Sequence, residues 1–214
     1  MLRENAYAAF KESLFTEQLH PGQFLSIQEL CDGLNVSISP LRDALRQLES
    51  EGLVELLPKK GVRIANVDRD FITNAFQVRR FLEVQACHEL SENAWPELQE
   101  IRNWTKSVAI RAESNIDENL LQDAYKADWA FHDGLIAAIG NDLLTQIHRR
   151  NSDKVRMVRL NRRFVASRVL PAMQEHLKIL DALIADDRDA AAAALNEHLC
   201  ISEARALGKE PGLV

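Results

Sequence analysis

The chain has 214 residues, of which 46% are apolar and 27% charged, and its formal net charge is −6. This balance is typical of a folded globular protein and excludes an intrinsically disordered chain. No apolar run approaches the roughly 20 residues that cross a bilayer, and the N-terminus has no signal-peptide core. The 3 cysteines are widely spaced, so they predict neither a disulfide framework nor a cysteine metal cluster. We therefore expect a cytoplasmic protein, and because only 8 Gly and 6 Pro interrupt it, a mainly α fold.

The first part of the chain, residues 1–67, predicts short helices. Apolar residues at helical spacing indicate a first helix that ends near the turn at residues 20–22. The spacing of Ser26 and Glu29 is that of a capping box, which begins a second helix that ends near Gly33 or Asn35. A third helix begins after Ser37 or Ser39 and ends at Gly52. Its predicted buried stripe consists of Leu41, Ala44, Leu45 and Leu48.

A β-hairpin is expected to follow these helices. Residues 53–57 and 62–67 are rich in β-branched and other apolar side chains, and the Pro-Lys-Lys-Gly segment between them is a turn. Helix, turn, helix and hairpin form the layout of a winged helix-turn-helix, in which the third helix enters the major groove of DNA.

The cations of this part of the chain gather where DNA would lie. Residues 1–67 are slightly acidic as a whole, yet five cations fall on the third helix or the hairpin: Arg42, Arg46, Lys59, Lys60 and Arg63. A local cationic edge holds phosphates even in a domain without net positive charge. The alternative is a solvated helix face beside a surface turn, and the pattern alone does not separate the two interpretations.

Several segments within residues 5–67 resemble the DNA-binding domain of the GntR family of bacterial regulators. The segments are Leu30, VSISPLRDAL at residues 36–45, LESEGLV at residues 48–54 and KGV at residues 60–62. The family commonly has a basic residue directly after the Val-Ser pair, whereas this chain has Ile38. The resemblance therefore leaves one base or phosphate contact unsupported here.

The resemblance implies DNA-contacting roles on the third helix and at the wing. It implies that Arg42 and Arg46 contact the major groove and the backbone. It implies that Ser37 and Ser39 form hydrogen bonds with phosphates, and that Lys60 and Gly61 form the tip of the wing.

The rest of the chain predicts a second, all-helical domain. Residues 68–70 are expected to be a linker, residues 71–207 a helical bundle and residues 208–214 a frayed tail. Asp128 and His132 lie one turn apart on the apolar stripe of a helix expected at 121–139, and that stripe is defined by Leu121, Tyr125, Leu135 and Ile139. His176 and His198 fall on the stripes of two later helices.

One carboxylate and three imidazoles are thus expected to point into one small core. A divalent cation bound by Asp128, His132, His176 and His198 would remove the cost of burying them. The alternative is a set of satisfied core residues in which Asp128 bonds His132. The other three histidines, His20, His88 and His148, are predicted to be ordinary surface residues.

This second pattern resembles the FCD domain, the helical effector domain of the FadR subfamily of GntR regulators. The segments that carry the resemblance are Val78-Arg79-x-x-Leu82-Glu83, Asp128-x-x-x-His132, Glu175-His176, Asp186-Asp187, residues 190–194 and His198. The resemblance implies a divalent ion, often zinc and sometimes nickel or another metal, on the Asp and the three His. It also implies a small organic acid held against that metal.

An arginine beside the metal would clamp the carboxylate of such an effector. Arg79 is the preferred candidate, because it lies beside the stripe of the first helix of this domain. The other candidates cluster before Pro171 and are Arg156, Arg159, Arg162 and Arg163. The alternative is that most of these arginines are solvated surface residues.

Two functional hypotheses follow. The first is a transcriptional regulator that binds an inverted repeat in double-stranded DNA as a homodimer and responds to a carboxylate effector. The second is a metal-dependent hydrolase of the HD type, because His132 and Asp133 form a His-Asp pair. Against the second, Asp133 points about 100° away from the stripe, and the winged helix would have no role.

Overall fold

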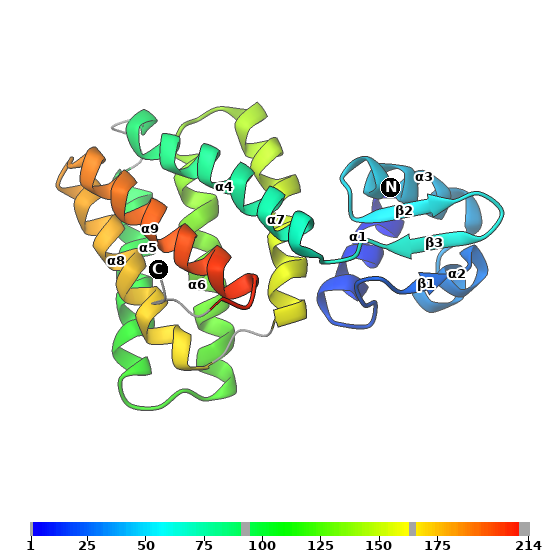
Figure 1. Cartoon of the computed structure of the whole chain (residues 1–214), viewed down its shortest axis with the longest axis horizontal. Helices are drawn as coiled ribbons and strands as arrows, with labels where there is room; N and C mark the ends of the chain where they lie inside the picture. Colours follow the sequence, from blue (N-terminus) through cyan, green and yellow to red (C-terminus); the bar gives the residue numbers. More distant parts are fainter. Residues whose placement is uncertain (1, 91–94, 163–165, 210–214) are drawn as a thin grey trace. The chain divides into compact units, whose positions relative to one another are not determined.

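The computed structural model describes residues 2–90, 95–162 and 166–209, and the chain divides into two compact units (Figure 1). The first unit holds residues 1–72 with 153–163, and the second holds residues 73–152 with 164–214. The predicted mainly α class is confirmed. Of the tail expected at 208–214, residues 210–214 lie outside the described part.

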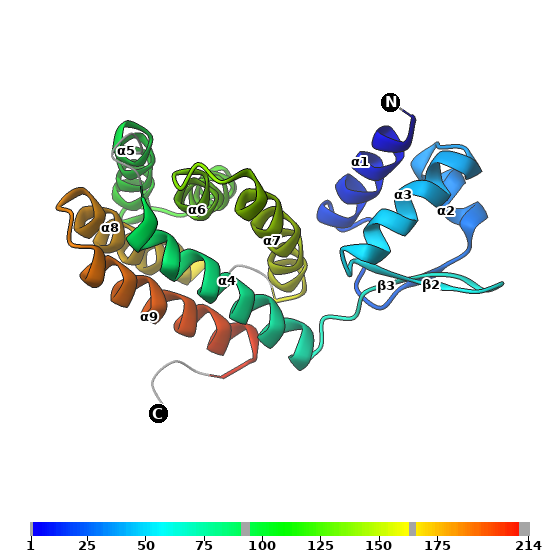
Figure 2. The ribbon, with the colours of Figure 1, turned by 90° about the horizontal axis from the view of Figure 1, so that it is seen from above.

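The first unit has the predicted winged-helix layout, visible in Figure 2. Its elements are α1 (Leu2–Phe15), β1 (Phe24–Leu25), α2 (Ile27–Leu34), α3 (Ile38–Ser50), β2 (Val54–Leu57) and β3 (Gly61–Ile64). Strand β1, which is only 2 residues long, was not predicted from the sequence. It completes an antiparallel sheet of order β1-β3-β2, in which Leu25 pairs with Val62 and Glu55 pairs with Arg63.

Local sequence signals place the two central helices. The capping box before α2 is present, because the Ser26 hydroxyl accepts from the Glu29 amide and the Glu29 carboxylate accepts from the Ser26 amide. Helix α2 ends at Asn35, whose φ of 51° is left-handed. Helix α3 is preceded by Ser37 and ends one residue before Glu51, slightly earlier than expected. Its predicted stripe is fully buried: Leu41, Ala44, Leu45 and Leu48.

The second unit is built from helices. They are α4 (Arg69–Glu89), α5 (Trp95–Ala112), α6 (Glu118–Ala137), α7 (Asp142–Arg162), the 3-10 turn η2 (Ala166–Arg168), α8 (Val169–Ile184) and α9 (Arg188–Ala206). The first residues of α4 and the last residues of α7 belong to the first unit. Two of the three residues expected as a linker, 69 and 70, are already helical. Pro171 lies in the first turn of α8, where its missing amide hydrogen bond costs nothing.

The core of the second unit lies between α5, α6, α8 and α9. Helix α5 packs against α6 and α8, and α8 packs against α9. A Cβ atom at Gly134 of α6 would lie 2.5 Å from Ile101 Cδ1 of α5, so the end of the Ile101 side chain would have to shift. None of the helices in residues 2–90, 95–162 and 166–209 has the length and apolar character needed to span a membrane.

The apolar stripe proposed for α6 is partly wrong. Leu121, Tyr125 and Ile139 are only half-buried, whereas the buried face carries Leu120, Ala124, Ala127, Phe131, Leu135 and Ile136. Alanine contributes little to a hydrophobic periodicity. The larger side chains of Leu121, Tyr125 and Ile139 therefore dominated the predicted stripe, although Ala124 and Ala127 are on the buried face. Asp128 and His132 nevertheless lie on the buried face, at 1% and 0% exposure.

Candidate functional site

The first candidate site is a cationic groove in the winged-helix unit. A cavity of about 550 Å³ lies between α3, the start of α2 and the hairpin, and four of its lining residues are the cations Arg42, Arg46, Lys59 and Lys60. All four side chains are exposed. The fold therefore brings the basic residues of the third helix and of the wing onto one surface, which is what phosphate binding requires.

Of the remaining residues expected at DNA, Gly61 lines this groove, whereas Ser37 and Ser39 are not among its lining residues. Ser37 and Ser39 are exposed at the start of α3, and the Ser37 side chain makes no capping hydrogen bond, which leaves its hydroxyl available. Ile38 is 47% exposed beside them. Arg46 is not free of anions, since its guanidinium lies 3.6 Å from Asp43, a weak pair at this exposure.

Position 61 requires glycine for a structural reason that the sequence did not reveal. Its φ of 135° lies in the region that L side chains rarely adopt, and a Cβ atom would lie 2.3 Å from the carbonyl oxygen of Leu25. Glycine at the wing therefore allows β1 to pair closely with β3. Lys59, two residues before it, also has a positive φ, of 62°, which directs the turn.

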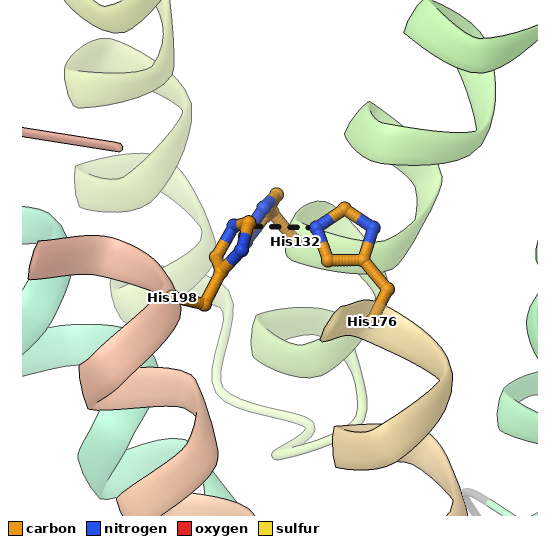
Figure 3. A group of neighbouring side chains, drawn as sticks. All are labelled: His132, His176 and His198. Carbon is orange, nitrogen blue, oxygen red and sulfur yellow. Dashed lines mark hydrogen bonds between the residues drawn. The ribbon is translucent and has the colours of Figure 1, made fainter. Parts of the chain in front are cut away.

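The second candidate site is a cluster of buried histidines in the helical unit. His132 comes from α6, His176 from α8 and His198 from α9, and Figure 3 shows the three rings converging on one point. All three are at most 1% exposed, and one ring nitrogen from each lies within 4.8 Å of those from the other two. The Nε2 atoms of His176 and His198 are 3.3 Å apart.

Asp128 adds an oxygen to this cluster. Its Oδ1 lies 3.7 Å from His176 Nε2 and 3.9 Å from His132 Nε2. Ligands of a tetrahedral zinc ion, at 2.0–2.1 Å from the metal, are about 3.4 Å apart. His132 Nε2 is buried and has no hydrogen-bond partner among the described residues. These atoms fit the donor set of a divalent cation.

A buried acid, Glu83 of α4, lies behind His132. Its Oε2 is 2.6 Å from His132 Nδ1, and its Oε1 accepts from Arg79 Nε at 2.7 Å and from His148 Nε2 at 3.0 Å. Burial by itself would raise the pKa of this fully buried carboxyl, but the positive charge of Arg79 and the bonds from His132 and His148 hold it well below its usual range. Glu83 is therefore a carboxylate.

His132 is a neutral imidazole. Burial lowers its pKa to about 4, and the neighbouring Arg79 charge acts in the same direction, against the opposing effect of Glu83. A neutral ring carries one proton and one lone pair, as metal ligation requires.

The third histidine of the cluster has a carboxylate of its own. His198 Nδ1 lies 2.6 Å from Glu175 Oε2, and Arg168 Nη2 contacts both oxygens of Glu175 at 2.9 Å. Although partial burial raises the pKa of Glu175, the hydrogen bond from His198, followed by the hydrogen bond and charge of Arg168, lowers it overall.

Arg79, the residue predicted for an effector, is 2% exposed. Its Nε is bound to Glu83, but neither Nη1 nor Nη2 has a hydrogen-bond partner among the residues that the structure describes. A guanidinium buried with two unbonded nitrogens is a ready receptor for an anion. Of the other arginines proposed for this role, Arg163 and the side chain of Arg162 lie outside the described residues.

Sequence reasoning was wrong about His148 and gave no role to Glu83 or Glu175. His148 was predicted at the surface but is 3% exposed. It was missed because α7 turns polar residues inward and leaves Leu143 and Ile147 exposed, the reverse of the usual signal. The four-residue spacing of Arg79 and Glu83 indicates an ion pair, yet it does not tell that the pair is buried.

The winged helix with its cationic groove, joined to a separate helical unit, defines a DNA-binding regulator. Comparison of the chain with known protein families agrees with this class. Residues 2–64 match the family model "Bacterial regulatory proteins, gntR family", and residues 74–200 match the model of the FCD domain. The chain belongs to the GntR family of transcriptional regulators and carries an FCD domain, a combination consistent with the FadR-like subfamily.

Related proteins cover nearly the whole chain. An HTH-type transcriptional regulator in an unstable DNA locus of Streptomyces ambofaciens is 28% identical over 92% of this chain and 81% of its own length. The HTH-type transcriptional repressor GlaR of Escherichia coli K12 is 23% identical, covering 91% of each. These relatives are regulators and not enzymes, so the hydrolase hypothesis is not supported. The aspartate of the His-Asp pair on which that hypothesis rested, Asp133, has its Oδ1 atom 3.4 Å from His148 Nδ1.

Solved structures give the same fold. A GntR transcriptional regulator from Rhodococcus sp. RHA1 has a TM-score of 0.77 at 21% identity, over 96% of this chain and 97% of that chain. The Zn²⁺-bound FCD domain of TM0439 has a TM-score of 0.52 at 26% identity, over 66% of this chain and 94% of that domain. GntR regulators bind DNA operators, and FCD domains bind small-molecule effectors.

Proposed function

We propose that this regulator holds a divalent metal ion on Asp128, His132, His176 and His198, and that a small organic acid bound beside the metal controls its affinity for an operator. The observation that carries the proposal is the convergence of one ring nitrogen from each of three buried imidazoles, with an Asp128 oxygen 3.7 Å from His176 Nε2 and 3.9 Å from His132 Nε2. The FCD domain of TM0439 was solved with Zn²⁺ bound, which supports a metal site in the FCD domain of this chain.

Zinc is the metal that we favour, with nickel as the alternative. Three imidazoles and one carboxylate make a four-coordinate nitrogen and oxygen set, which suits zinc. The bound ion supplies a fixed positive charge that neutralises Asp128. Arg79 adds a second cation, which is linked to the ligand His132 through Glu83. Together they select an anionic ligand with one or more carboxylates.

For DNA, we propose that Arg42, Arg46, Lys59 and Lys60 bind phosphates and base edges. We also propose that Ser37 and Ser39 bind phosphates at the start of α3 and that Gly61 forms the tip of the wing with Lys60. The cationic groove supports this assignment. A homodimer would place two such surfaces on an inverted repeat. Exposed apolar side chains of α4, Val78 and Phe81 at 39% and 73%, are available for the contact between two copies. Such a regulator acts in the cytoplasm, where bacterial DNA lies.

The deciding experiment combines DNA, metal and ligand. Genomic fragments bound by the protein are sequenced, and the enriched inverted repeat becomes a fluorescent probe for anisotropy titrations at about physiological salt. Zinc-loaded protein is then titrated with and without citrate, malate or succinate. We expect one of these acids to change the operator Kd by about 5- to 150-fold, the usual range of allosteric coupling.

Matched variants separate the metal from the fold. His198→Asn removes a proposed ligand, whereas His88→Asn changes an exposed histidine outside the cluster. Zinc affinity should fall in the first by more than the roughly 10- to 100-fold caused by outer-shell changes, and should stay unchanged in the second. Equal zinc affinity in the two variants would refute the metal site, and an acid that binds without changing operator affinity would refute the proposed control.

A further inference from the structure

Two of the three clustered imidazoles turn their Nδ1 atom toward a carboxylate. His132 Nδ1 lies 2.6 Å from Glu83 Oε2, and His198 Nδ1 lies 2.6 Å from Glu175 Oε2. An ionised carboxylate only accepts hydrogen bonds, so the nitrogen that faces it must carry the proton. In a neutral ring the lone pair is then left on Nε2, the atom that points toward the other histidines.

Both carboxylates are held in place from behind by arginine. Arg79 Nε donates to Glu83 at 2.7 Å, and Arg168 Nη2 donates to both oxygens of Glu175 at 2.9 Å. Glu83 comes from α4 and Glu175 from α8, so the arrangement arises twice, on separate helices. This repetition indicates that each carboxylate acts on the histidine in front of it.

We propose that Glu83 and Glu175 are positioning residues that fix His132 and His198 as Nδ1–H tautomers, so that both rings present an Nε2 lone pair to the centre of the cluster. The benefit for metal binding rests on the proposed function, but the tautomers exist without metal. Without the carboxylates, each ring can place its proton on Nε2, and that proton must leave before a metal binds. Outer-shell partners of this kind change metal affinity by about 10- to 100-fold.

The test reads the tautomers directly. Metal-free protein labelled with ¹⁵N-histidine gives long-range ¹H–¹⁵N spectra in which the two neutral tautomers differ, and single histidine variants assign the signals. The variant that decides is Glu175→Gln, because Glu175 is 23% exposed and its replacement does not bury an unpaired group. Its amide is a weaker acceptor and can donate to Nδ1. Glu83→Gln, at the centre of a buried network, is the second variant.

The matched control is Glu197→Gln, which makes the same change on α9 next to His198 at a 67% exposed side chain that pairs only loosely with Lys178. We expect Nδ1 protons on His132 and His198 in the wild type and the control. In Glu175→Gln, the proton of His198 should shift toward Nε2 while His132 is unchanged, and zinc affinity should fall about 10- to 100-fold.

Two results would overturn the proposal: an Nε2 proton on His198 in the metal-free wild type, or equal zinc affinity and spectra in Glu175→Gln and Glu197→Gln. A third result, in which the wild-type protein binds no zinc but carries both Nδ1 protons, would leave the tautomer proposal standing. It would refute the metal site and support the tautomer assignment, so the two claims fail separately.

Discussion

Replacing Arg79 by lysine is expected to remove most of the protein's affinity for a carboxylate effector while leaving the fold intact. Lysine keeps a positive charge for Glu83, whose Oε1 now accepts from Arg79 Nε at 2.7 Å. It lacks the planar fork that would grip a carboxylate with two parallel hydrogen bonds. The substitution therefore tests the two Nη atoms and not the ion pair.

The expected magnitude follows from those two nitrogens. Both are buried and have no hydrogen-bond partner among the described residues. A hydrogen bond to a charged group contributes about 1.5–3 kcal/mol. Losing both, with partial replacement by the ammonium group, should weaken the effector by about 3 kcal/mol, which is roughly a hundredfold in Kd.

The assay is calorimetric titration of zinc-loaded protein with the carboxylate that acts on the wild type. The control is Arg80→Lys, the next residue on α4, whose partly exposed side chain pairs with Glu203. The control should bind like the wild type. An unchanged Kd in Arg79→Lys would refute the assignment of Arg79 as the effector clamp.

Four further predictions concern other parts of the chain. Because burial holds the pKa of His132 at about 4, against 6.5 for the free group, only the unfolded chain takes up this proton between those pH values. In metal-free protein, the free energy of unfolding measured with urea should therefore be fully retained above about pH 6.5 and decrease by up to about 3 kcal/mol towards pH 4. An equal decrease in a His132→Gln variant would contradict this reasoning. Gly61→Ala should cost about 2 kcal/mol or more, because its Cβ meets the Leu25 carbonyl; urea denaturation checks it, and a wild-type midpoint would be inconsistent with the clash. Lys60→Gln should weaken operator binding in anisotropy titrations and reduce the salt slope by about 1, whereas an unchanged slope would exclude a phosphate contact. Ile38→Arg should steepen the same slope by about 0.9 if that side chain reaches a phosphate.

Local signals in the sequence determined the winged helix. The capping box at Ser26, the left-handed Asn35 and the stripe of α3 act within a few residues of chain, so they can be recognised without knowing the fold. The two-residue strand β1 was missed, because it exists only through pairing with β3, more than thirty positions away in the chain.

The histidine cluster was partly predictable for the same reason. Helical spacing put Asp128 and His132 on one face, and His176 and His198 on the inner faces of their own helices, and all are buried. The stripe residues chosen to define α6 were partly wrong, yet the polar residues were placed correctly. A one-turn spacing depends only on helix geometry, whereas burial of a given Leu or Tyr depends on what packs against it.

Only the tertiary structure decided what surrounds that cluster. Glu83 meets His132 and His148 across 49 and 65 positions of sequence, and Glu175 meets His198 across 23. No local pattern carries such pairings, because they follow from how α4, α6, α7, α8 and α9 pack. By itself the sequence placed Asp128, His132, His176 and His198 on the inner faces of their helices, but it did not reveal the burial of His148. The packing of the helices decided which atoms of those side chains face one another, including which nitrogen of His132 and of His198 faces a carboxylate.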